Sequence, residues 1–268
     1  MASRTQLLFL SLGRRFSQRV KESVLGVQDY VVLTARGLAA IFTPPHYHRE
    51  LIQQMDSIGV QSLSIVVLTG MFTGMVLALQ SAASLDAFGA RPYVGRLVAI
   101  SMVRELGPVL TALMVTGRVA SGIAAELGSM TVTDQISALR ALGTDPIRKL
   151  VIPRVVAGTL MLPVLTVIAD AVGMLGAAII TSLQLRVAPT VFWNNVVQGL
   201  YVQDIWMGLL KPVVFGFVIV TLACYVGLRT SGGTQGVGRS TTDAVVAGSV
   251  AVLAGDFLIT KLLIATIY

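Results

Sequence analysis

The fold class is decided by a long apolar stretch, 155-VVAGTLMLPVLTVIADAVGMLGAAIITSL-183. It contains a single ionisable side chain, Asp170. An α-helix needs about 20 mostly apolar residues to cross the hydrocarbon core of a bilayer. This stretch therefore predicts a transmembrane helix.

Four more apolar runs accompany it, so that the predicted spans cover about 58–80, 97–116, 155–183, 205–228 and 244–267. The whole chain is 54% hydrophobic and only 12% charged, with a mean hydropathy of +0.80. A soluble domain carries about 25% charged residues. A membrane barrel would show alternating segments of about ten residues instead of such runs. The sequence thus predicts an all-α polytopic membrane protein with five transmembrane helices.

The basic residues lie mostly on one side of these spans. Alternate segments outside the spans contain fourteen Lys and Arg on one side and three on the other. Cytoplasmic loops of membrane proteins carry the excess of Lys and Arg. The net charge of +7 is therefore read as a topology signal and not as a sign of nucleic-acid binding. We expect a cytoplasmic N-terminus and a periplasmic C-terminus.

Residues 1–57 are predicted to form an amphipathic, interfacial region before the transmembrane domain of residues 58–268. Apolar residues recur at helical spacing from Phe16 to Leu38, with basic residues off that stripe. This pattern is typical of a helix lying in the membrane interface. Pro44 and Pro45 end it, and a short polar helix over about 46–56 leads into the first span.

Two opposite charges, Arg104 and Glu105, lie inside the second predicted span. Charges at the centre of a membrane helix cost about 2.5–3.5 kcal/mol each on insertion scales, so they normally face the bundle interior, a partner or water. Neighbouring side chains on a helix point about 100° apart, so each needs its own partner. The candidate partners lie on the other spans: Asp170, Lys211, Asp256 and Lys261.

We expect Arg104 to pair with Asp256 and Glu105 to pair with Lys211. Three roles remain open for these charges: an architectural ion-pair network, a polar lining for a charged lipid headgroup, or a proton relay.

Small residues and a proline mark the first two spans. Gly107 and Pro108 follow the charges after Leu106 and predict a kink or hinge. Gly70 and Gly74 form a GxxxG arrangement, which lets another helix approach closely. Packing within one subunit and a dimer seam both remain open for this pair.

The segment 117–154 is the one long cytoplasmic connection that the topology predicts. Thr133 or Asp134 can cap a short helix running to about Leu142, and Gly143 suits the position just beyond its end. Asp145 and Pro146 then suit the start of the next helix. The short helix has a small apolar face, which either packs on its own bundle or enters a groove on another protein: Ile136, Ala138, Leu139 and Leu142.

Other apparent sites carry little chemistry. Residues 233–240 match the spacing of a phosphate-binding P-loop. A P-loop follows a buried strand, whereas this segment follows a membrane span. We therefore expect a glycine-rich turn here. His46 and His48 have no further ligands nearby, which predicts no metal site. Cys224 lies inside a span as a packing residue. No catalytic residues are predicted.

Several stretches closely resemble the MlaE-type permease family, which includes YrbE and TGD relatives. They are 104-RELGPV-109, 117-GRVASGIAAELGSM-130, 133-TDQISAL-139, 142-LGTDP-146, 162-LPVLT-166, 233–242 and 255-GDFL-258. The resemblance covers the chain from about the first span to the end. Members of this family are the membrane subunits of ABC transporters that move lipids between bacterial membranes.

The resemblance implies a homodimeric permease that is not itself an enzyme. A separate cytoplasmic ATPase dimer would bind ATP and Mg, so no cofactor is expected in this chain. A periplasmic ring of MCE-domain proteins and a STAS-domain subunit are further implied partners, and phospholipid is the implied cargo. The implied location is the bacterial inner membrane.

The resemblance also suggests site residues. The family's lipid cavity lies at the dimer interface, lined by the first, second and fifth spans, and Arg104, Glu105 and Asp256 match its charged positions. Lys211 and Asp170 are added to this candidate site on their charge alone. The short helix looks like a coupling helix that rests on the ATPase, with contacts expected from Asp134, Gln135, Ile136, Ala138 and Leu139. The alternative function is a secondary transporter in which Glu105, Asp170 and Asp256 carry protons or ions.

Overall fold

The computed structural model describes residues 25–37 and 47–267. The chain divides into two units, residues 1–46 and 47–268. In the first unit residues 25–37 form a helix. The rest of the predicted interfacial helix, together with Pro44, Pro45 and His46, lies outside the described residues.

The second unit contains five helices that are long and apolar enough to cross a membrane, and the described residues contain no strand. The prediction of an all-α polytopic membrane protein is therefore confirmed. The first long helix consists of α2 (His48–Ile58), η1 (Val60–Ser62) and α3 (Leu63–Asp86). The third consists of η5 (Ile147–Val151) and α8 (Ile152–Leu183), the fourth is α10 (Val202–Leu228), and the fifth is α11 (Gly233–Ile267).

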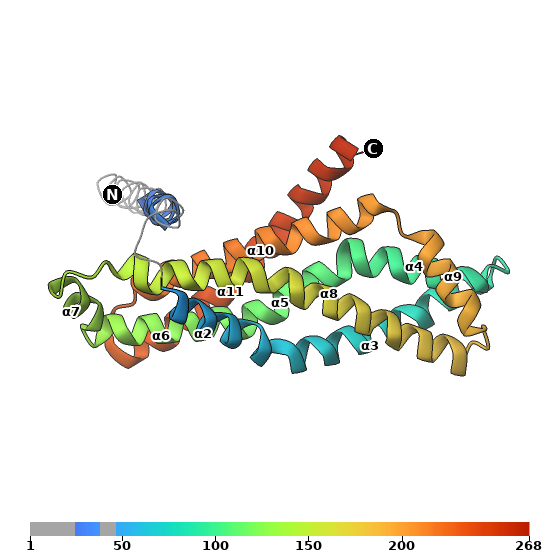
Figure 1. Cartoon of the computed structure of the whole chain (residues 1–268), viewed down its shortest axis with the longest axis horizontal. Coiled ribbons are helices and arrows are strands. Elements are labelled where there is room, and N and C mark those ends of the chain that lie inside the picture. The colour runs from blue at the N-terminus through green and yellow to red at the C-terminus, as the bar shows by residue number, and fades with distance from the viewer. Residues whose placement is uncertain (1–24, 38–46, 268) are drawn as a thin grey trace, which may run out of the picture. The chain divides into compact units, whose positions relative to one another are not determined.

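The second long helix is the most irregular. Its segments follow one another as η2 (Arg91–Tyr93), α4 (Val94–Ser101), η3 (Met102–Leu106), α5 (Gly107–Val115), η4 (Thr116–Ala120) and α6 (Ser121–Val132). Both η3 and η4 are π-helical, as is η5. Two short helices join the long ones: α7 (Gln135–Ala141) and α9 (Pro189–Gly199). Figure 1 shows α7 and α9 at opposite ends of this unit, which we call the α7 end and the α9 end.

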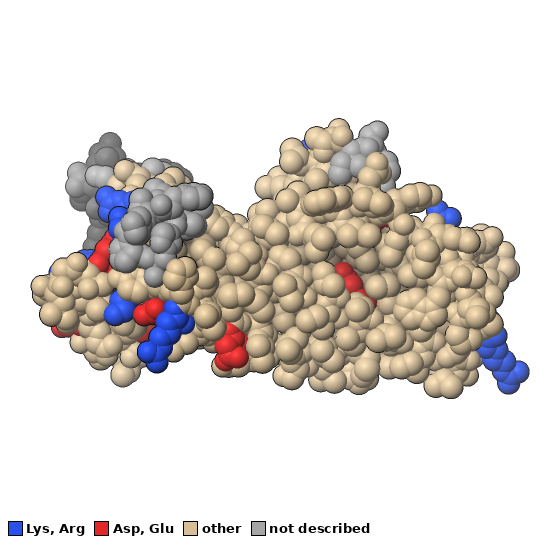
Figure 2. All heavy atoms as spheres, in the orientation of Figure 1, with Lys and Arg blue, Asp and Glu red and all other residues tan. Residues whose placement is uncertain are grey.

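Charged side chains are also concentrated at the two ends of this unit. On the face drawn in Figure 2 they gather mainly towards the ends, and a largely uncharged band interrupted by a small acidic patch lies between. Such a band is what a bilayer core requires of the surface that faces it.

The helices extend further at the α7 end than the apolar runs predict. The second long helix continues to Val132, and the fifth begins at Gly233 instead of about residue 244. The expectation of a glycine-rich turn over residues 233–240 is therefore wrong, because this stretch forms the first turns of α11. Glycine costs a helix only about 1 kcal/mol relative to alanine, so the contacts of the finished bundle can override its low propensity. The turn itself lies just before, where Gly232 and Gly233 have φ values of 89° and 67°.

Helix α9 is too short to span a membrane and has no counterpart among the predicted spans. Pro189 occupies its first turn, where a missing N–H costs nothing. Phe192 and Val196 are buried in a small apolar cluster with Val94 and Val98 of α4. The sequence between the third and fourth spans thus forms a helical cover for α4.

The contact between α3 and α8 depends on glycine. A Cβ atom at Gly74 would lie 1.9 Å from the carbonyl oxygen of Gly173, and one at Gly70 would lie 2.8 Å from that of Ala169. The structure thus places both glycines of the GxxxG pair at a helix contact within one chain.

Replacing Gly74 with valine is expected to destabilise the bundle by about 1–3 kcal/mol, because the helices must separate to admit the side chain. Thermal unfolding of the purified protein in detergent measures the effect. Gly122→Ala is the matched control, since a Cβ atom there meets nothing within 4 Å. Equal melting temperatures for the two variants would contradict this account of the contact.

Candidate functional site

The charged pair Arg104 and Glu105 lies on the π-helical segment η3, immediately before Pro108. At the end of this segment the N–H of Gly107 donates to the carbonyl of Met102, five residues earlier. Wide turns of this kind are rare and frequently lie at functional sites. The two charged side chains bind different partners, as their angular separation predicts.

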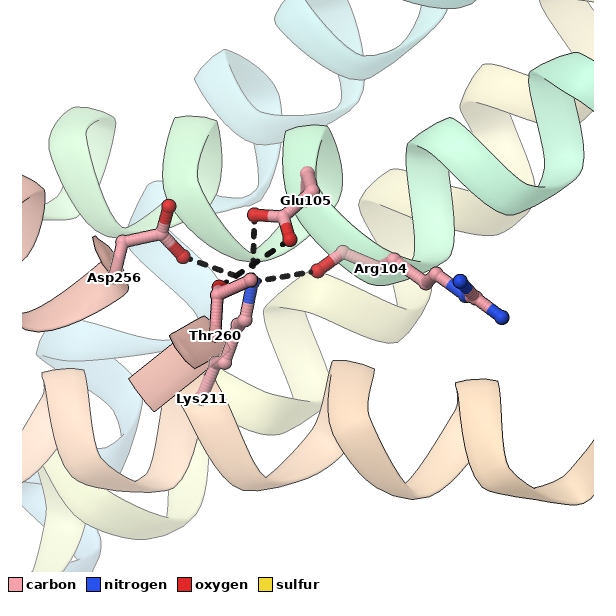
Figure 3. A network of polar contacts seen from close by, with 5 residues as sticks. All are labelled: Arg104, Glu105, Lys211, Asp256 and Thr260. Atoms are coloured by element: carbon pink, nitrogen blue, oxygen red, sulfur yellow. Dashed lines mark hydrogen bonds and ion pairs between the residues drawn. The ribbon is translucent and has the colours of Figure 1, made fainter. Parts of the chain in front are cut away.

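Lys211 of α10 is the centre of a polar cluster, which we call the Lys211 cluster. Its Nζ lies 2.6 Å from Glu105 Oε2 and 2.9 Å from Asp256 Oδ1. The same ammonium donates to the carbonyl oxygen of Arg104 at 2.9 Å. Thr260 Oγ1 completes the cluster by donating to Glu105 Oε1 at 3.3 Å. Figure 3 shows these groups converging from three helices on one ammonium.

The carbonyl of Arg104 is available to Lys211 because of Pro108. In an α-helix this carbonyl would accept a hydrogen bond from the residue four positions later, and proline has no N–H to donate. An unpaired carbonyl inside the membrane is costly. The ammonium of Lys211 therefore supplies the donor that Pro108 lacks.

The expected pairing of Glu105 with Lys211 is present, but that of Arg104 with Asp256 is wrong. The guanidinium of Arg104 points away from the Lys211 cluster in Figure 3 and binds Asp204 instead, with Nε donating to Oδ1 at 2.6 Å. Asp204 Oδ2 also accepts the N–H of Tyr201 at 2.9 Å, at the start of α10.

Asp204 was missed because it lies one residue before the predicted fourth span. The sequence spacing between Asp204 and Lys211 could have identified it. It precedes Lys211 by seven residues, which is two helical turns and places both side chains on one face of α10.

Burial differs sharply within the site. The side chains of Lys211 and Asp204 are 0% exposed, whereas those of Glu105 and Asp256 are 41% and 22% exposed. A fully enclosed cation is therefore neutralised by two carboxylates that still present surface. The Lys211 cluster holds one positive and two negative charges, and the accessible part of it is acidic.

Asp170 lies apart from this cluster. It is buried, and its Oδ1 atom has no hydrogen-bond partner among the residues that the structure describes. A Cβ atom at Gly107 would lie 1.8 Å from that oxygen, so Asp170 packs on the backbone just before the proline. Of the other candidate partners, Lys261 is exposed on α11. The structure therefore brings together Glu105, Lys211 and Asp256, but not Asp170.

The predicted coupling residues lie on and beside α7. Asp134 precedes this helix in the left-handed conformation, with a φ of 57°, and its side chain makes no capping hydrogen bond, contrary to expectation. Ile136 is buried, Leu139 is half-buried, and Gln135 and Ala138 are exposed.

The end of α7 follows the sequence prediction more closely. Gly143 has a φ of 76°, in the left-handed region that glycine adopts without strain. Asp145 Oδ1 accepts the N–H of Ile147 at 2.9 Å and so caps the next helix. Leu142 is 80% exposed, which leaves an apolar side chain uncovered at this tip.

The fold and the site define a multi-pass α-helical membrane protein with ion pairs inside its bundle. Residues 51–262 match the family described as Permease MlaE. The chain belongs to this permease family.

Curated relatives agree with this assignment. A probable ABC transporter permease protein of Rickettsia typhi is 42% identical over 96% of this chain and 99% of its own length. The intermembrane phospholipid transport system permease protein MlaE of Haemophilus influenzae is 39% identical over 80% of this chain and 82% of its own. The chloroplastic protein TRIGALACTOSYLDIACYLGLYCEROL 1 of Arabidopsis thaliana is 37% identical over 80% of this chain and 61% of its own.

Replacing Lys211 with methionine is expected to lower the free energy of unfolding by about 3–5 kcal/mol, because it leaves two neighbouring carboxylates and a carbonyl without their cation. Adding Glu105→Gln and Asp256→Asn should restore part of the loss, since the repulsion disappears. Unfolding in detergent measures both, with Lys261→Met as the control on an exposed lysine. A triple variant no more stable than Lys211→Met would show that the ion pairs do not hold the cluster.

Proposed function

We propose that this chain is the permease subunit of an ABC transporter that moves phospholipid between the inner and outer membranes of a bacterium. Family membership supports the permease role, and the name of the Haemophilus influenzae relative supports the cargo. The proposed organisation is an interfacial region over residues 1–57 and a permease domain over 58–268. ATP is hydrolysed by a separate subunit that binds the ATP and Mg.

The observation that carries this proposal is the partial exposure of Glu105 and Asp256 beside an apolar helix surface. A lipid needs a polar place for its headgroup and an apolar place for its chains. Large apolar side chains are exposed along α11, both before and after Asp256: Val246, Val250, Leu253, Phe257, Leu258 and Leu262. The Lys211 cluster supplies the polar place next to them.

The same apolar surface supports a homodimer. A helix whose large side chains remain uncovered needs either lipid or a second protein surface against it. A cavity between two copies, lined by the first, second and fifth long helices, would place Arg104, Glu105, Lys211 and Asp256 at or near its wall. We extend the proposal to a periplasmic ring of MCE-domain proteins and a STAS-domain subunit on the family resemblance alone.

Helix α7 is the proposed contact with the ATPase. It lies at one end of the bundle, between α6 and the start of the third long helix (Figure 1). Ala138 on this helix and Leu142 just after it are exposed. Movement of α7 would be carried through α6, the last segment of the second long helix, to Gly107 and Pro108, which provide the hinge. In this proposal the α7 end lies in the cytoplasm and the protein in the inner membrane, and the distribution of basic residues supports this orientation.

A secondary transporter is a weaker interpretation of the same charges. Glu105 and Asp256 both contact the buried ammonium of Lys211, so a proton taken up by either would weaken the neutralisation of an enclosed cation. Asp170 is separate from them and cannot complete a relay by direct contact.

Glu105→Lys and Asp256→Arg are each expected to reduce lipid flux about tenfold, because each removes a carboxylate from the buried ammonium of Lys211 and reverses the charge of the surface offered to the headgroup. Flux is measured with labelled phospholipid in proteoliposomes containing the complete complex. Co-purification of the ATPase should remain normal. Asp243→Lys, at an exposed position on α11, is the control. Wild-type flux in both cluster variants would refute the proposed site.

Ala138→Pro should uncouple ATP hydrolysis from lipid movement. The N–H of Ala138 donates to the carbonyl of Asp134 at 2.9 Å, and proline removes this bond and disrupts the short helix. Ala138→Ser keeps the N–H and is the control. The measurement is the number of lipids moved per ATP hydrolysed, and an unchanged ratio in the proline variant would exclude α7 as the coupling element.

A further inference from the structure

The half of the second long helix nearest the α9 end carries three arginines with different surroundings. Arg91 forms an ion pair with Asp86, and Arg104 forms one with Asp204. The side chain of Arg96, between them, makes no hydrogen bond or ion pair with any residue in the ranges 25–37 and 47–267. One cation on this stretch thus has no protein counter-charge in the described chain.

Arg96 lies at an open hollow of about 330 Å³. The hollow lies between the end of α3 and the outer turns of the second long helix, and its walls are mostly apolar. They are formed by Leu85, Tyr93, Arg96, Leu97, Ile100 and Ser101. A water molecule takes about 30 Å³ in the liquid, so the hollow can admit part of a much larger molecule.

The stem of Arg96 packs against a glycine. A Cβ atom at Gly199, the last residue of α9, would lie 2.5 Å from Arg96 Cγ. The bare backbone at Gly199 therefore makes room for the arginine stem against α9. This contact limits the positions that the guanidinium can reach.

The polar and apolar groups are ordered along the helix. Tyr93 and Arg96 come first, Leu97 and Ile100 follow towards the middle of the bundle, and the small residue Ser101 ends the lining. With a rise of about 1.5 Å per residue, Ile100 lies about 6 Å further along the axis than Arg96. A cation followed by an apolar wall is the order in which a phospholipid presents its phosphate and its acyl chain to a membrane helix.

We propose that Arg96 and this hollow bind an anionic phospholipid, with the phosphate on the guanidinium and the start of an acyl chain along Leu97 and Ile100. A lipid of net negative charge supplies the counter-charge that Arg96 lacks, whereas a zwitterionic lipid brings a cation of its own. The planar guanidinium can bind two phosphate oxygens at once. The proposal rests on the proposed lipid transport and adds a lipid class to it. It also adds a position, because this site is cationic whereas the exposed part of the Lys211 cluster is acidic.

Arg96→Gln tests the proposal in the full-length protein, reconstituted in nanodiscs of equal parts phosphatidylglycerol and phosphatidylcholine. Lipids retained after extraction are counted by native mass spectrometry. The wild type should retain phosphatidylglycerol preferentially, and Arg96→Gln should reduce that preference about tenfold, because it removes one charge-assisted contact. Arg186→Gln, which alters an exposed arginine before α9, is the control.

A second variant tests whether the apolar hollow contributes to lipid binding in addition to the charge of Arg96. Leu97→Trp fills the apolar wall and leaves Arg96 in place, so retention of both lipids should fall. Unchanged preference in Arg96→Gln, or an equal loss in Arg186→Gln, overturns the proposal. Binding of millimolar inorganic phosphate by a wild type that retains no phosphatidylglycerol also overturns it, since that would show a site for free phosphate.

The transport assay distinguishes this proposal from the function on which it rests. If the wild-type complex moves lipid while Arg96→Gln keeps its lipid preference, only the anionic site is refuted. If the wild-type complex moves no lipid, the proposed function itself is refuted.

Discussion

An ammonium group enclosed in an apolar helical bundle must be neutralised, and Lys211 shows how this constraint organises the protein. Removing a charge from water costs several kcal/mol even after the surroundings relax. The ammonium contacts a carboxylate on η3, a carboxylate on α11 and the carbonyl of Arg104. These contacts hold the second and fifth long helices against α10. Any motion that separates these helices has to find another partner for the cation.

Close backbone contacts make this arrangement possible. A Cβ atom at Gly208, one turn before Lys211, would lie 2.3 Å from the carbonyl oxygen of Val103. The absence of a side chain there brings α10 against η3, within reach of the carbonyl left without a donor by Pro108. In lipid, where apolar surfaces gain little from avoiding water, such packing and hydrogen bonding supply much of the attraction between helices. Glycine, proline and lysine therefore act together at this contact.

The sequence predicted the features that depend on composition and on one helix at a time. The five long helices, the short helix over α7 and the left-handed glycine after it follow from apolar runs and turn residues. The pairing of charges depends on how helices rotate against one another, which explains why Glu105 was paired correctly and Arg104 was not. Asp204 fell outside a span whose limits were set by hydropathy. Helix α9 and the helical start of α11 are stabilised by tertiary contacts that local propensity does not reveal.

The π-helical segment η3 has a consequence for how the second long helix is read. A π-turn takes up about one residue more than an α-turn, and each residue turns the chain by about 100°. The angular positions of side chains before Met102 and after Leu106 are therefore offset around the helix axis by about 100° from those of a regular α-helix. No single helical wheel describes the whole helix. Its first part can face α9 while its later part faces α10 and α11. Deleting one residue here would bring the two parts back into step and turn one of these faces away from its neighbours.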